Sequence, residues 1–107
     1  MALSAFMSDE FARNARRPAD YVCGRVVAGS SEQVTVPTGA VYARVSVSAT
    51  MTIAFGANPT AVVVADTDDG TASEQITANE AEWFYVKDIA KIAFFGTGNV
   101  TVSFYKV

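Results

Sequence analysis

The chain has 107 residues, of which half are hydrophobic and 18% are charged. This length suits one domain, and the composition favours a packed core over a disordered chain. The formal net charge is −3, and the few basic residues are scattered apart from Arg13, Arg16 and Arg17, so we expect no nucleic-acid partner.

Cys23 is the only cysteine, so the chain can form no internal disulfide, and a buried place in a strand is expected for it. The N-terminus lacks the basic start and unbroken apolar run of a secretory signal peptide. No apolar run approaches the roughly 20 residues that span a bilayer. These features predict synthesis and folding in the cytoplasm, with no membrane as a partner.

Residues 1–20 differ from the rest of the chain. Apolar residues recur there at helical spacing, at Leu3, Phe6, Met7 and Phe11. Pro18 ends this pattern. We expect residues 1–20 to form a short N-terminal arm, helical or extended. This arm is a frayed terminus, covers one end of the β-core, or reaches onto a neighbouring subunit.

From Tyr21 the hydrophobic period changes to two, which predicts a β-domain over residues 21–107. We expect strands near residues 21–27, 32–36, 41–48, 51–55, 73–77, 82–86, 89–95 and 100–107. Gly24 is expected at a bulge, and GTGN (96–99) is expected to be a hairpin turn. AVVV (61–64) fits either a buried strand or a segment across the core. The sequence therefore predicts an all-β fold, an antiparallel β-sandwich of the jelly-roll kind.

The carboxylates of DTDDG are Asp66, Asp68 and Asp69. Counted from Asp66, this stretch has glycine at position 5 and threonine at position 12, so it fails the EF-hand pattern. A looser calcium site stays open. The alternative is a polar corner between two strands, where aspartates accept backbone hydrogen bonds and Gly70 adopts a positive φ.

The sequence offers little for catalysis. It contains no histidine, which removes the commonest general base and most zinc and iron sites. No glycine-rich stretch precedes a helix as a phosphate-binding loop requires. We therefore predict no catalytic residue, no cofactor and no metal ligand, and a protein that is not an enzyme.

The stretch EWFYV (82–86) gathers Trp83, Phe84 and Tyr85. In a strand, Trp83 and Tyr85 point one way and Phe84 the other, so Phe84 is expected to enter the core. The other two rings then serve as part of a subunit contact, pack on a different protein, or form a platform for a ligand such as a carbohydrate.

The order of segments from Val34 to the C-terminus carries a family resemblance. VYARVSVSAT is followed by MTIAFG, an Ala/Val-rich stretch, DTDDGTASEQITANE, an aromatic strand, IAKIAFFGTGNV and TVSFYKV. This order resembles that of small β-proteins encoded with the virion genes of tailed bacteriophages. Several such proteins are head decoration or cement proteins that bind the assembled capsid shell. The resemblance does not cover the N-terminal arm and assigns no binding residue.

The resemblance and the lack of catalytic groups lead to one expectation. We expect a structural virion protein that binds and stabilises a phage capsid shell, located on the capsid surface. Its expected partners are the major capsid protein and itself, as a dimer or trimer. The alternative is a tail or fibre module that contacts a carbohydrate or receptor through EWFYV.

Overall fold

The computed structural model describes residues 17–62 and 67–106. Residues 1–16 of the expected N-terminal arm lie outside this part, and residues 17–20 form an irregular lead into the first strand. The regular elements are β1 (Tyr21–Thr35), β2 (Tyr42–Val47), β3 (Met51–Gly56), β4 (Glu74–Ile76), β5 (Ala81–Tyr85) and β6 (Lys91–Tyr105). The described residues contain no helix, and hence none that could cross a bilayer.

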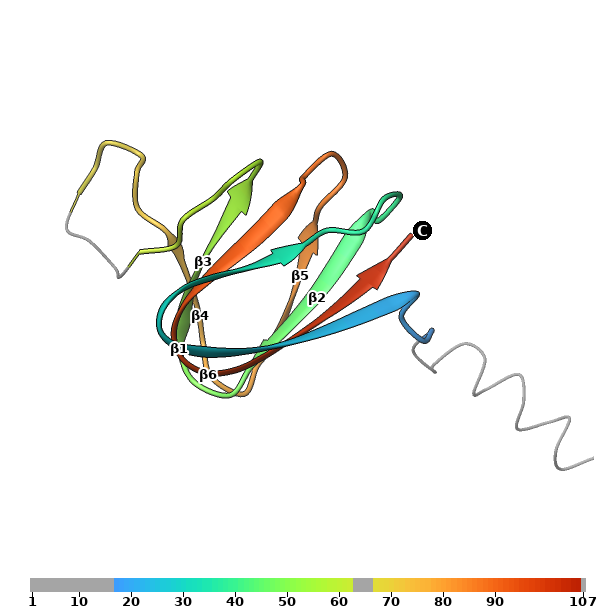
Figure 1. The fold of residues 1–107 in the computed structure, drawn as a ribbon, viewed down its shortest axis with the longest axis horizontal. Helices are drawn as coiled ribbons and strands as arrows, with labels where there is room; N and C mark the ends of the chain where they lie inside the picture. The colour runs from blue at the N-terminus through green and yellow to red at the C-terminus, as the bar shows by residue number, and fades with distance from the viewer. Residues whose placement is uncertain (1–16, 63–66, 107) are drawn as a thin grey trace, which may run out of the picture.

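All six strands belong to one antiparallel sheet organised around β6. β1 pairs with β6 along almost its whole length. On the other side of β6, β3 pairs with its first part and β2 with its last part. β4 pairs with β3, and β5 pairs with β2. The sheet therefore has two halves, one containing β3 and β4 and the other containing β2 and β5, and both β1 and β6 run through the two halves. Figure 1 shows how these two strands bend and curl the sheet into a half-barrel.

The bend in β6 coincides with Gly96 and Gly98, whose φ angles are 152° and 154°. The turn between β2 and β3 packs closely against this bend. A Cβ atom at Gly98 would lie 2.7 Å from Ser48 Oγ and 3.2 Å from Ala49 Cβ. Only glycine fits this backbone conformation and this close approach without strain.

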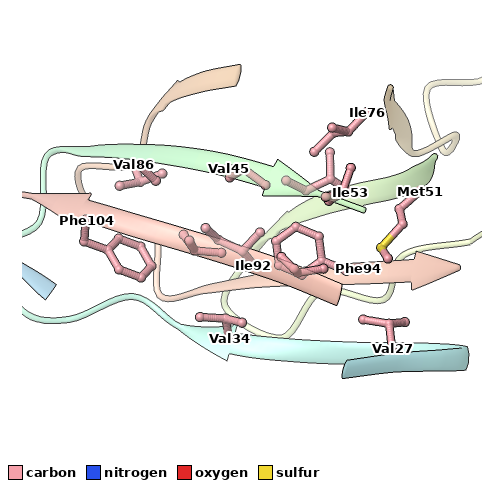
Figure 2. Close-up of a cluster of buried hydrophobic side chains, with 14 of the residues drawn as sticks. Val27, Val34, Val45, Met51, Ile53, Ile76, Val86, Ile92, Phe94 and Phe104 are labelled. Carbon is pink, nitrogen blue, oxygen red and sulfur yellow. The ribbon is translucent and has the colours of Figure 1, made fainter. Parts of the chain in front are cut away.

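The inner side of the curled sheet holds the hydrophobic core. Figure 2 shows side chains from both halves meeting there, among them Val34 and Phe94 from one half and Val45 and Phe104 from the other. The buried apolar cluster consists of Val27, Val34, Ala40, Ala43, Val45, Val47, Met51, Ile53, Ile76, Val86, Ile92, Phe94, Val100, Val102 and Phe104. This burial is the main favourable contribution to folding.

The loop that follows β3 covers the outer side of one half of the sheet. The Gln33 side chain donates from Nε2 to Asn58 Oδ1 (2.9 Å) and to the Pro59 carbonyl (2.8 Å). The Ala61 N–H donates to Ser31 Oγ at 3.1 Å. Ala93, which points outward between β1 and β3, is consequently fully buried.

The expectation of an all-β, antiparallel fold is confirmed, but a sandwich of two sheets or a jelly roll is not. The hairpin turn expected at 96–99 is wrong, because β6 continues through it and stays paired with β1. The bulge expected at Gly24 is also wrong, since Gly24 pairs in register with Thr101, and the irregularity lies between Ala28 and Ser31. Ala61 and Val62 lie in a loop, while the rest of AVVV is outside the described residues.

Candidate functional site

The half of the sheet that contains β2 and β5 has an apolar outer side that is open to solvent. It is formed by β5, β2, the last part of β6 and the first part of β1. Five large hydrophobic side chains are exposed on it, namely Val22 (60%), Val26 (73%), Tyr42 (44%), Trp83 (53%) and Tyr85 (60%). We call this surface the exposed face.

The strand register accounts for the direction of these side chains. β2 buries alternate residues, including Val45, so Tyr42 and Arg44 point outward. β5 places Tyr85 opposite Tyr42, and Trp83 opposite Arg44. Directly opposite residues in an antiparallel pair share a face, so both β5 rings also point outward.

The aromatic rings on the exposed face contact one another. Tyr42 and Tyr85 pack edge to face, with ring centroids 5.7 Å apart. The ring centroids of Trp83 and Tyr105 lie 5.0 Å apart. The Arg17 guanidinium lies over the Tyr105 ring, with its Cζ atom 6.0 Å from the ring centroid. We call the three exposed rings, Tyr42, Trp83 and Tyr85, the aromatic ridge.

A small polar network lies at the corner of the exposed face where the described chain begins. Asp20 accepts a hydrogen bond from the Lys106 backbone N–H at 2.8 Å. It also forms an ion pair with Arg17, with Nη2 and Oδ2 2.7 Å apart. The hydrogen bond from Lys106 and the charge of Arg17 hold the pKa of Asp20 below its usual value. The network therefore ties the start of β1 to the end of β6.

A shallow depression lies on the exposed face beside the ridge. Its volume is about 250 Å³, and Gly24, Arg25, Val26, Asn99, Val100 and Thr101 line it. Gly24 faces Thr101 across the β1–β6 pair, and both are small enough to leave the sheet surface low. The exposed face thus combines a ridge and a depression.

The described part of DTDDG forms a hydrogen-bonded turn. The Asp69 carboxylate accepts from the Thr71 N–H (3.0 Å) and from the Thr71 hydroxyl (2.6 Å). These bonds, led by that of the hydroxyl, hold the pKa of Asp69 below its usual value. Asp66 lies outside the described residues. Across the described residues, no three potential metal-ligating side chains come together.

A hollow with a volume of about 420 Å³ lies elsewhere on the described part of the chain. It lies beside the turns that follow β1 and β5. Its titratable residues are Asp88 and Lys91, and the rest of its lining includes Pro37, Val86 and Ile89.

The thiol of Cys23 is half-buried on the inner side of β1, opposite Val102. Burial raises the pKa of this thiol above its usual value, which disfavours the reactive thiolate. Cys23 lies in a strand as expected, but it is only partly buried, with its side chain packed against the core.

The prediction for EWFYV is confirmed in its alternation. Phe84 packs against the core, and its ring centroid lies 5.0 Å from that of Phe55. Trp83 and Tyr85 are exposed. Sequence reasoning did not single out Val22 and Val26 as parts of the same surface. The alternation in YVCGRVV contained this signal, but the face with Val22 and Val26 is apolar while the face that turns inward carries Arg25, so the pattern alone did not show which one is outside.

Comparisons with protein-family models, with curated proteins and with solved structures gave no significant match.

Proposed function

We propose that the chain is a structural, non-enzymatic protein of a tailed-phage virion that binds and stabilises the capsid shell. The observation that carries the proposal is the exposed face, on which five large hydrophobic side chains lie together on a rigid, hydrogen-bonded sheet. Several large hydrophobic side chains exposed on one face mark a site of protein contact. The order of sequence segments from Val34 onward, which resembles that of head decoration proteins, supports the choice of a capsid.

The curled sheet suits such a role. We propose that it represents an open form of the jelly-roll-like sandwich, because β1 and β6 each pass from one half of the sheet to the other. A contact face can join copies of the protein to one another, and an oligomer multiplies the contacts made with a symmetric shell. Modest individual contacts then add up to stable attachment through avidity.

The test uses particles of the phage or prophage that encodes the chain. Heads and tails are separated, and the copies of the protein in each are counted by mass spectrometry. Heads from a deletion strain are then challenged by heat, with and without added purified protein. We expect many copies on heads, and greater heat resistance when protein is added. Protein that is absent from heads and stays unbound to deletion-strain heads contradicts the proposal.

A second candidate is a tail or fibre module that binds a carbohydrate or receptor. The exposure of Trp83 and Tyr85 favours it, since sugar rings stack on aromatic side chains that solvent can reach. A glycan array with the intact protein and a Trp83→Ala variant tests this function. Specific glycan signals that the substitution abolishes, together with location on tails, would favour it over the capsid role.

A further inference from the structure

The size of the exposed face approaches what one partner contributes to a stable interface. At the exposed fractions given above, its five large hydrophobic side chains offer on the order of 600 Å² of surface. A standard interface buries roughly 800 Å² per partner, and the polar residues between the five side chains supply the remainder. Monomeric proteins rarely leave a larger apolar patch in water.

The composition of the exposed face is that of an interface centre. Arg44 is the only charged residue among the side chains that point outward from the strands of this face. The strand segments concerned are Val22 to Val26, Tyr42 to Ser46, Ala81 to Tyr85 and Asn99 to Tyr105. Interface centres are enriched in Trp, Tyr and Arg and depleted in Lys and Glu. Arg17 adds a basic side chain at the edge of this face, over Tyr105. The combination of Trp, Tyr and Arg fits a protein partner.

The relief of the exposed face is self-complementary. The aromatic ridge rises over β5 and β2, and the depression of about 250 Å³ lies over β1 and β6. A two-fold axis lying between two facing copies brings the ridge of each over the depression of the other. A symmetric dimer requires one surface to carry both complementary features, and this surface does.

We propose that the exposed face binds a second copy of the chain in a two-fold symmetric dimer, with each ridge packed over the partner's depression. The two sheets then lie face to face, at the spacing of roughly 10 Å that sheet packing gives. The inference rests on the proposed function only in treating the exposed face as a protein-binding surface. Within the proposed capsid role, the exposed face joins two copies into the oligomer whose repeated contacts attach it to the shell.

The first test is the mass of the purified full-length protein, measured by analytical ultracentrifugation between about 1 and 200 µM, the range in which micromolar dimers dissociate. We expect a shift from 11.3 kDa to twice that mass as the concentration rises. Trp83 is the only tryptophan and lies on the ridge, so its fluorescence should shift to shorter wavelength over the same range. A monomer at every concentration, or a trimer, overturns the proposal.

Two variants test the interface itself, one on each feature. Tyr85→Ser lowers the ridge. Gly24→Gln fills the depression, and the fold can accept it because a Cβ at Gly24 meets only the Val100 carbonyl oxygen, at 4.0 Å. Each should weaken the dimer at least tenfold, as substitutions at interface centres do. Val62→Ser, which changes an exposed hydrophobic residue outside the exposed face, is the control and should leave the dimer unchanged.

Circular dichroism melting shows whether each variant is folded. Dimers that persist in both folded interface variants overturn the proposed arrangement. If either variant does not fold, concentration-dependent hydrogen exchange in the wild-type protein replaces it. Protection should then grow on β5 and on the first part of β1, and protection confined to β3 and β4 overturns the proposal.

Failure of this inference and failure of the proposed function give different results. A dimer that binds no phage heads supports the inference and contradicts the capsid role. A monomer that is found on heads and stabilises them supports the capsid role and overturns the dimer.

Discussion

The centroid of the Trp83 indole ring lies 5.0 Å from the centroid of the Tyr105 phenol ring, and the two ring planes are tilted by 46°. These residues belong to β5 and β6, and β2 separates those strands, so the Trp83 ring reaches across β2. Trp83 is exposed, whereas Tyr105 is only 5% exposed. The contact therefore places a solvent-accessible ring over a buried one whose hydroxyl has no hydrogen-bond partner among the described residues.

Removing the Tyr105 hydroxyl should not destabilise the protein. A buried hydroxyl without a partner loses its hydration and gains nothing in return, so Tyr105→Phe should leave the free energy of unfolding unchanged or raise it by about 1 kcal/mol. Urea unfolding measures this. Tyr42→Phe is the control, because the exposed Tyr42 hydroxyl lies on the same face. A loss of more than about 1 kcal/mol in Tyr105→Phe would show that the hydroxyl is bonded.

Adding a methyl group at the bend of β6 should destabilise the fold. In Gly98→Ala the new Cβ meets Ser48 Oγ at 2.7 Å and Ala49 Cβ at 3.2 Å, at a φ of 154°. Ser48 cannot retreat freely, because its Oγ accepts the Asn99 N–H at 2.8 Å. We expect a loss of about 1–3 kcal/mol in the free energy of unfolding.

Gly24→Ala is the matched control for Gly98→Ala, since both glycines lie in paired strands. Its Cβ meets no atom closer than 4.0 Å, so stability should stay the same or rise by about 0.5 kcal/mol. Equal effects of the two substitutions in urea unfolding would contradict the close packing at the bend.

Stability at low pH should depend on Asp20. The pKa of its carboxyl is lowered in the folded protein, first by the hydrogen bond from the Lys106 N–H, so the ionised form favours folding. This contribution is fully present above the usual pKa of 3.8 and is lost as the pH falls through the lower pKa of the folded state. The Asp20→Asn variant should therefore lose less stability than the wild type on acidification below pH 3.8.

Melting temperature measured from pH 6 to pH 2 checks the effect of Asp20. Asp69→Asn serves for comparison, because the Asp69 pKa is lowered by a separate cause, its hydrogen bonds with Thr71. The effects of these two distant substitutions on the acid slope should add. An Asp20→Asn curve parallel to that of the wild type below pH 4 would rule out the proposed role of Asp20.

Truncation of Phe94 should be among the most damaging single changes. Its side chain is fully buried near the bend of β6, in the core between the two halves of the sheet. Phe94→Ala should cost about 3–5 kcal/mol, a large part of the stability of a small domain. Val22→Ala on the exposed face should change the unfolding free energy of the monomer by less than about 0.5 kcal/mol. Similar losses in both variants, measured by urea unfolding at low protein concentration, would contradict the assignment of the core.

The sequence predicted the strands whose two faces differ. In β2, Ala43, Val45 and Val47 alternate with residues that include Arg44 and Ser46, so the period and the buried side could both be read. The alternation of Trp83, Phe84 and Tyr85 was equally informative. In such strands the local pattern shows which side is buried. In β2 one face is clearly more polar than the other, and in EWFYV a single ring points toward the core.

The sequence misled where a glycine permits more than one conformation. Gly96 and Gly98 fit a hairpin turn, yet in β6 they allow a bend within one continuous strand. The choice depends on β1, which pairs across the bend and comes from the other end of the chain. The exposed face was missed for a related reason, because Val22 and Tyr42 become neighbours on one surface only when β6 lies between their strands.

The pairing of β1 with β6 also has a consequence for synthesis on the ribosome. β6 is the common neighbour of β1, β2 and β3, and it is the last of the six strands to be translated. A nascent chain that stops before β6 has no central strand around which the others can assemble, so folding must wait for it. Prematurely terminated products should thus remain unfolded and be degraded.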